Sequence, residues 1–270
     1  MLDPRMTTLA EGLVGHSTQL QSGEHVLIEA FDVPEAMVIA LIRATRAVGA
    51  HPHVAIRNGR ISRALMVEGA DEQYELMAAS DLHRMQHMAA YIGLRGGLNA
   101  SESADIPSDR LQAFGRLYGQ PVHMQERVKR TRWCVLRWPT PSMAQLAGKS
   151  TEAFEDFYFD VCTLDYSAMA GAAEALRKRM AETDAVHLKG PGDTDLTFSI
   201  KDIPAVPCCG EMNIPDGECF TAPVKDSING VMHYNTPTIY HGHRFENVRL
   251  VFKDGKIAEA TADRGGEHLD

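Results

Sequence analysis

An acidic residue beside a turn is the part of this sequence best suited to chemistry. Glu218 follows the turn Pro215-Asp216-Gly217 and opens a short strand-like run that ends before Pro223. Proline restricts the backbone of such a turn and glycine supplies the conformation that a tight turn requires, so the carboxylate after it has a fixed support. A carboxylate held in this way suits a metal ligand or a general base. The alternative is a solvated surface charge, which is the commoner role of an acidic residue beside a turn.

Histidines and cysteines offer weaker candidates for metal binding. Three close histidine pairs could supply two imidazoles each, but only the second has the i, i+4 spacing that places both rings on one helix face. No pair has a carboxylate placed like the glutamate of H-E-x-x-H, so surface or core histidines are the alternative. The adjacent Cys208 and Cys209 are better explained as small apolar groups. The histidine pairs are His51 with His53, His83 with His87, and His241 with His243.

Composition and missing motifs exclude several classes of protein. The sequence contains no G-x-x-x-x-G-K, G-x-G-x-x-G, G-x-S-x-G or H-E-x-x-H motif. Its five cysteines include no C-x-x-C pair, which argues against a disulfide framework or a thiolate zinc cage. A net charge of -9 disfavours a nucleic-acid partner. Because no signal sequence or membrane-spanning apolar stretch is visible, we expect a cytoplasmic protein without membrane partners.

The first half of the chain alternates between helical and strand-like patterns. Apolar residues recur with helical spacing over 7–20 and 35–48, and the short apolar runs 25–30 and 52–56 are typical of buried strands. A strand, a helix and a strand in succession predict parallel strands joined by a right-handed crossover, with helices on both faces of the sheet. Further helices are expected over 72–90, 108–118 and 169–182, and further strands over 91–95 and 132–138.

Beyond residue 183 the pattern changes to short alternating runs separated by turns, and no long helix is expected. Asp254-Gly255 is a strong hairpin signal between two of these runs, 248–252 and 257–261. The predicted fold class is therefore α/β, with an N-terminal parallel-sheet α/β domain over 1–184 and a strand-rich α+β domain over 185–270. The other expected strands are 185–189, 195–200, 230–234 and 238–240.

Several runs follow one another in a distinctive order in the second half. They are Val186-His187-Leu188-Lys189-Gly190-Pro191-Gly192, Thr194-Asp195-Leu196-Thr197-Phe198-Ser199-Ile200, Asn213-Ile214-Pro215-Asp216-Gly217-Glu218-Cys219-Phe220-Thr221-Ala222-Pro223 and Tyr234-Asn235-Thr236-Pro237. Together they resemble the metalloaminopeptidases of the aminopeptidase T type, peptidase family M29. The resemblance implies a two-domain cytoplasmic homodimer that holds two divalent ions, usually zinc, cobalt or magnesium, and removes N-terminal residues from peptides.

The resemblance also implies a role for Glu218, because the glutamate before Phe-Thr-Ala-Pro is a metal ligand in that family. The family's other ligands lie in a C-terminal segment with a G-E-[FL]-x-[IL]-G-x-N element, which this sequence lacks. His268 and Asp270 form a His-x-Asp ending, but we transfer no ligand role to them because the segment before them is missing. Each ion of a hydrolytic site needs about three protein ligands, so we expect this chain to be incomplete for catalysis.

The leading hypothesis is a metal-dependent aminopeptidase in which two metal ions activate a shared water, with Glu218 as a metal ligand and peptides as substrate. Catalytic residues are left unassigned. Two alternatives stay open. One is an iron-dependent ring-cleaving oxygenase on the same scaffold, and the other is a catalytically silent binding or assembly module in which the turn before Glu218 is only structural.

Overall fold

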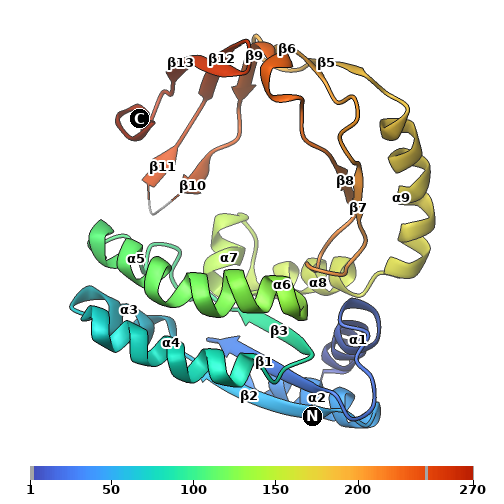
Figure 1. Cartoon of the computed structure of the whole chain (residues 1–270), viewed down its shortest axis with the longest axis vertical. Helices are drawn as coiled ribbons and strands as arrows, with labels where there is room; N and C mark the ends of the chain where they lie inside the picture. The colour runs from blue at the N-terminus through green and yellow to red at the C-terminus, as the bar shows by residue number, and fades with distance from the viewer. Residues whose placement is uncertain (1–2, 241–242, 270) are drawn as a thin grey trace. The chain divides into compact units, whose positions relative to one another are not determined.

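The computed structural model describes residues 3–240 and 243–269, which form two compact units (Figure 1). Unit 1 contains the chain up to Ser167 together with Cys209–Asp216, and unit 2 contains Ala168–Cys208 and the chain from Gly217 onward. The predicted domain boundary after residue 184 falls inside unit 2. It stays a prediction, because compactness alone does not show which segments fold independently.

Unit 1 is built on a parallel sheet with the strand order β2-β1-β3-β4. All three of its ladders are parallel, which confirms the predicted sheet. The two central strands, β1 and β3, are almost wholly buried, as strands covered on both faces must be. The strands are β1 (His25–Phe31), β2 (His51–Arg57), β3 (Ala90–Arg95) and β4 (Arg132–Arg137).

Helices surround this sheet, and most of them lie close to the predicted ranges. The helix expected over 72–90 is wrong at its end, because it stops at Met85 and Ala90 already belongs to β3. A helix over 59–67 was not predicted. The helical segments of unit 1 are α1 (Pro4–Gly12), η1 (Leu13–Ser17), α2 (Glu35–Ala47), α3 (Gly59–Val67), α4 (Asp71–Met85), α5 (Ser108–Phe114), η2 (Gly115–Arg127), α6 (Val128–Arg130), α7 (Pro141–Leu146) and α8 (Thr151–Cys162).

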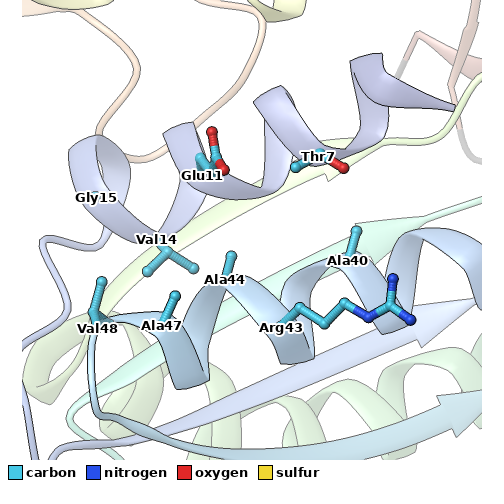
Figure 2. A pocket seen from close by; sticks show the side chains of 9 residues that line it. All are labelled: Thr7, Glu11, Val14, Gly15, Ala40, Arg43, Ala44, Ala47 and Val48. Atoms are coloured by element: carbon cyan, nitrogen blue, oxygen red, sulfur yellow. The ribbon is translucent and has the colours of Figure 1, made fainter. Parts of the chain in front are cut away.

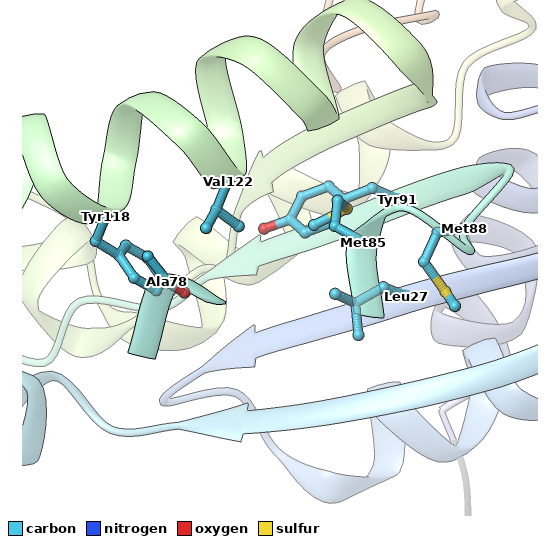
Figure 3. Packing of buried hydrophobic residues seen from close by; sticks show 7 residues of the cluster. All are labelled: Leu27, Ala78, Met85, Met88, Tyr91, Tyr118 and Val122. Atoms are coloured by element: carbon cyan, nitrogen blue, oxygen red, sulfur yellow. The ribbon is translucent and has the colours of Figure 1, made fainter. Parts of the chain in front are cut away.

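One core of unit 1 lies between the sheet, α4 and η2 (Figure 3). Leu27 of β1 and Tyr91 of β3 pack there on apolar side chains from the two helical segments. Burying a large apolar side chain of this kind stabilises the fold by roughly 1.5–3 kcal/mol. Because side chains alternate along a strand, the next residues on the same face are Glu29 and Gly93. The apolar core therefore gives way to a charged group toward the carboxyl ends of the strands.

A hollow separates α1 and η1 from α2 (Figure 2). Val14 of η1 points toward Ala44 and Ala47 of α2 across this hollow. Its volume is about 260 Å³ and most of its wall is apolar. Glu11 and Arg43 are the charged residues that line it, and the alanine and valine side chains between them suit packing of the helices.

Unit 2 contains an antiparallel sheet with the strand order β13-β12-β9-β6-β5 and two short hairpins, which confirms the predicted fold class. Asp254 and Gly255 both have positive φ and form the predicted hairpin turn. No helix in the described part of the chain is long and apolar enough to cross a bilayer. The elements are α9 (Tyr166–Ala181), which starts in unit 1, β5 (Ala185–Lys189), β6 (Asp195–Ser199), β7 (Val206–Cys208), β8 (Glu218–Phe220), η3 (Lys225–Ser227), β9 (Asn229–Tyr234), β10 (Thr238–Tyr240), β11 (His243–Phe245), β12 (Val248–Lys253), β13 (Lys256–Thr261) and η4 (Gly266–His268).

Candidate metal centre

Glu218 is the first residue of β8, immediately after the predicted turn. Strand β8 pairs antiparallel with β7, and Cys208 lies opposite Glu218. The residue before it, Gly217, has a φ of 130°, and a Cβ there would lie 2.9 Å from the sulfur of Met169. Only glycine fits such a position without strain. The turn therefore delivers an exposed carboxylate at the start of a short strand.

A metal centre needs further ligands around this carboxylate, about three for each zinc ion. Over residues 3–240 and 243–269, no group of three or more His, Cys, Asp or Glu side chains is arranged to hold a metal ion. The described residues therefore do not fit a complete metal centre by themselves. The role of Glu218 as a ligand stays a prediction, and no catalytic step through a metal can be derived from these residues.

Two other carboxylates of unit 2, Asp193 and Asp195, already have basic side chains as partners. Asp195 Oδ1 on β6 lies 2.7 Å from His187 Nε2 on β5, and its Oδ2 lies 3.6 Å from Lys189 Nζ. The hydrogen bond with His187 and the charge of Lys189 outweigh partial desolvation and lower the pKa of Asp195. Asp193 accepts a hydrogen bond of 2.7 Å from Arg249 Nε, which likewise lowers its pKa. Both carboxylates are ionised at neutral pH and occupied by these partners.

The histidine pairs singled out in the sequence do not assemble a ligand set in the described residues. His53 Nε2 lies 2.8 Å from His25 Nδ1 across β1 and β2, which brings two imidazoles together. The rings of His83 and His87 lie 4.9 Å apart between centroids. His241 lies outside the described residues. Among the described residues, neither His51 with His53 nor His83 with His87 belongs to a group of three or more His, Cys, Asp or Glu side chains that could hold a metal ion.

A buried charge in unit 1 was not anticipated from the sequence. Glu29, in the middle of β1, accepts hydrogen bonds from Tyr91 Oη at 2.6 Å, Arg95 Nη2 at 3.1 Å and Arg57 Nε at 3.3 Å. Burial raises its pKa, but the charge of Arg95, the hydrogen bond from Tyr91 and the charges of His123 and Arg57 outweigh that effect and lower the pKa overall. In the sequence, the only indication of a buried charge was that Glu29 lies inside the apolar run 25–31.

Comparison with known proteins decides the family. The sequence matches the thermophilic metalloprotease (M29) family over residues 2–270. The chain belongs to this family. The predicted enzyme class, a metallopeptidase of family M29, is thereby confirmed.

Named relatives extend the comparison. Aminopeptidase PepS of Streptococcus thermophilus is 25% identical over 289 residues, which cover 95% of this M29 chain and 70% of PepS. Aminopeptidase 2 of Geobacillus stearothermophilus is 40% identical over 57 residues, which cover 21% of this chain and 14% of that protein.

Two solved structures share the fold of this M29 chain. AmpT from Thermus thermophilus has a TM-score of 0.81 and 18% identity, with all of this chain and 74% of AmpT covered. The 2,5-dihydroxypyridine dioxygenase from Pseudomonas putida KT2440 has a TM-score of 0.56 and 14% identity, with 98% of this chain and 70% of the dioxygenase covered. At these identities the similarity concerns the fold alone.

Proposed function

We propose that this chain acts as a metal-dependent aminopeptidase that removes N-terminal residues from peptides. The observation that carries this proposal is the M29 match over residues 2–270, together with relatives that are named as aminopeptidases. The dioxygenase shares only the fold at 14% identity, so it adds no weight to an oxygenase function.

Within this function, we propose that Glu218 supplies one ligand of a centre that holds two divalent ions, zinc, cobalt or magnesium. The support is its place after a turn that requires glycine at position 217, where the carboxylate is exposed and its backbone is held in a strand. When bound, such ions would supply an activated water. Glu218 would need further ligands beside it, because the described residues contain no group of three or more His, Cys, Asp or Glu side chains arranged to hold a metal ion.

The expected setting of the protein is also part of this proposal. We propose a homodimer in the cytoplasm that takes peptides as substrate, which rests on the resemblance to the M29 aminopeptidases. Light scattering after size-exclusion chromatography measures the mass in solution. A single species at the chain mass of 29.7 kDa would contradict the dimer.

The role of Glu218 is tested by Glu218→Gln, which removes the charge and keeps the size. We expect at least about tenfold weaker binding of Zn²⁺ or Co²⁺ in calorimetry and a matching loss of leucine-p-nitroanilide hydrolysis. Glu182→Gln is the matched control, because Glu182 is an exposed carboxylate in the same unit and has no proposed role. The control should bind metal and hydrolyse the substrate like the unaltered chain.

The outcomes separate the hypotheses. Equal metal binding by Glu218→Gln and the unaltered chain would remove Glu218 from the ligand set. Consumption of 2,5-dihydroxypyridine with Fe²⁺, without peptide hydrolysis under Zn²⁺, Co²⁺ or Mg²⁺, would replace the aminopeptidase with an oxygenase. Activity in neither assay, together with no binding of Zn²⁺, Co²⁺, Mg²⁺ or Fe²⁺, would favour a binding or assembly module, whereas metal binding without activity would favour a site that is incomplete for catalysis.

A further inference from the structure

A pocket of about 420 Å³ lies in unit 1 where three parallel strands end. Phe31, Arg57 and Arg95, the last residues of β1, β2 and β3, line it together with residues of α3, α4, α5 and η2. The strand order reverses between β1 and β3, because β2 lies on one side of β1 and β3 lies on the other. Open α/β sheets bind ligands outside the carboxyl ends of their strands at such a reversal. The volume falls within the range of small-molecule sites.

The floor of this pocket is the buried Glu29 with its two arginines. Glu29 Oε1 accepts from Arg57, and its Oε2 accepts from Tyr91 and Arg95. The carboxylate is therefore fully engaged and is not available to bind a cation. Both guanidinium groups are partly exposed, so they extend from the buried carboxylate to the pocket.

Positive charge is in excess in this hydrogen-bonded network. Asp81 accepts hydrogen bonds of 2.7 Å from both Arg57 Nη2 and Arg84 Nη2, so three arginines share the carboxylates of Glu29 and Asp81. The network has a surplus of one positive charge. Arg95 Nη1 is also buried without a hydrogen-bond partner, so the charge of Arg95 is only partly compensated.

The walls of the pocket are apolar and incompletely covered. Ile61 of α3 is 63% exposed, Leu65 is also exposed, and no residue of this helix is buried. The stacked rings of Phe114 and Tyr118, with centroids 4.8 Å apart, form a second apolar surface of the same pocket. Exposed apolar side chains gathered around a few polar groups mark a binding site more often than an ordinary surface.

We propose that this pocket binds a small monocarboxylate with an apolar or aromatic body. The carboxylate lies against Arg57 and Arg95, each of which bonds one of its two oxygens through N–H groups that Glu29 and Asp81 leave free, and the body lies between α3 and the stacked rings. The surplus of one positive charge matches a monoanion, whereas a phosphate dianion would leave negative charge unpaired among apolar walls. All of these residues belong to unit 1, so the proposal does not depend on Glu218 or on a metal.

The probes are phenylpropanoate and phenylpropanol, which share the body and differ in the charged group. We expect saturable binding of phenylpropanoate in titrations followed by methyl NMR, with the largest shifts at Ile61, Leu65 and Met66. Phenylpropanol should bind at least about tenfold more weakly, because it cannot form the charge-assisted pair with the arginines.

Ile61→Glu places a negative charge at the exposed wall of the pocket. Removing Arg95 instead would take one of two arginines from the buried Glu29 and endanger folding, whereas an exposed position tolerates the change. We expect at least about tenfold weaker binding of phenylpropanoate by Ile61→Glu, through like-charge repulsion. Leu76→Glu is the control, since Leu76 is 72% exposed on α4 outside the pocket, and it should bind like the unaltered chain.

Four results would overturn the proposal. They are the absence of saturable phenylpropanoate binding, equal binding of phenylpropanol, methyl shifts confined to residues outside the pocket, and unaltered binding by Ile61→Glu in a folded protein. Because the titrations contain no metal and no peptide, none of these results bears on the aminopeptidase function.

Discussion

The two units of the molecule differ in how much apolar surface they bury. In unit 1, β3 has five buried residues out of six, whereas every residue of β13 in unit 2 is exposed. Among the buried apolar side chains of the described residues, only Leu196, Ile200 and Phe245 lie in unit 2. Unit 1 is therefore stabilised by a buried apolar core, whereas unit 2 is stabilised mainly by the hydrogen bonds between its strands.

Charges follow the same division. Unit 1 buries Glu29 among arginines and a tyrosine, whereas the ion pairs of Asp193 and Asp195 in unit 2 are exposed. A buried charge is costly to leave unpaired, and an exposed one is well solvated. The charged groups of unit 1 are therefore integral to its stability, while those of unit 2 can exchange one partner for another.

A pair of leucines tests the first half of this comparison. Leu94→Ala in β3, which is fully buried, should lower the free energy of unfolding by about 2–5 kcal/mol through the cavity that it leaves. Leu188→Ala in β5, which is 40% exposed, should cost less than about 1 kcal/mol.

The two units can be followed separately in urea unfolding. Trp133 and Trp138 both lie in unit 1, so tryptophan fluorescence reports on that unit alone, and circular dichroism reports on both. Equal losses for the two leucine variants would contradict the contrast between the cores.

Substitution of the buried Glu29 tests the contrast between the buried charges of unit 1 and the exposed charges of unit 2. Glu29→Gln removes the carboxylate that pairs with Arg95 and one of the two that pair with Arg57, and it should cost about 3 kcal/mol, since breaking a buried ion pair from one side is strongly destabilising. Asp195→Asn, in an exposed pair with His187, should leave stability unchanged within error. Fluorescence-monitored urea unfolding measures the first variant, and circular dichroism measures the second. A neutral result for Glu29→Gln would mean that the cluster does not stabilise unit 1.

The smallest expected effect is a pH dependence that arises in unit 1. Burial lowers the pKa of His123 below its ordinary value of 6.5, against the opposing charges of Glu29 and Asp81 and with support from Arg127 and Arg95. Below pH 6.5 the unfolded chain therefore binds a proton that the folded chain does not bind, so stability should fall as the pH falls from 6.5 toward the folded pKa. His123→Gln should flatten this slope in unfolding curves recorded between pH 7 and pH 5. An unchanged slope would assign the dependence to other groups, such as His53, whose pKa burial also lowers.

Much of the fold was predictable because local patterns and long-range packing agree. The buried run 25–30 and the spacing of apolar residues over 35–48 correspond to β1 and α2, and Asp254-Gly255 forms the expected hairpin. The errors lie where tertiary contacts override the pattern. The apolar pattern over 72–90 continues past Met85, but the chain turns there so that the backbone of Ala89 can bond to His25 at the start of β1.

The candidate sites were predictable to different degrees. The turn before Glu218 depends on neighbouring residues in the sequence, so its geometry was visible there. The cluster around Glu29 joins three strands that are far apart in sequence. No local pattern predicts that Arg57 and Arg95 both donate hydrogen bonds to Glu29.

The sequence by itself determined the family, most of the order of helices and strands, and the turn that presents Glu218, because these depend mainly on residues close together along the chain. Only the tertiary structure decided which charges are buried and which strand ends share a pocket. The physical reason is that parallel pairing aligns the carboxyl ends of β1, β2 and β3 at one edge of the sheet. There, residues separated by dozens of positions form one electrostatic environment.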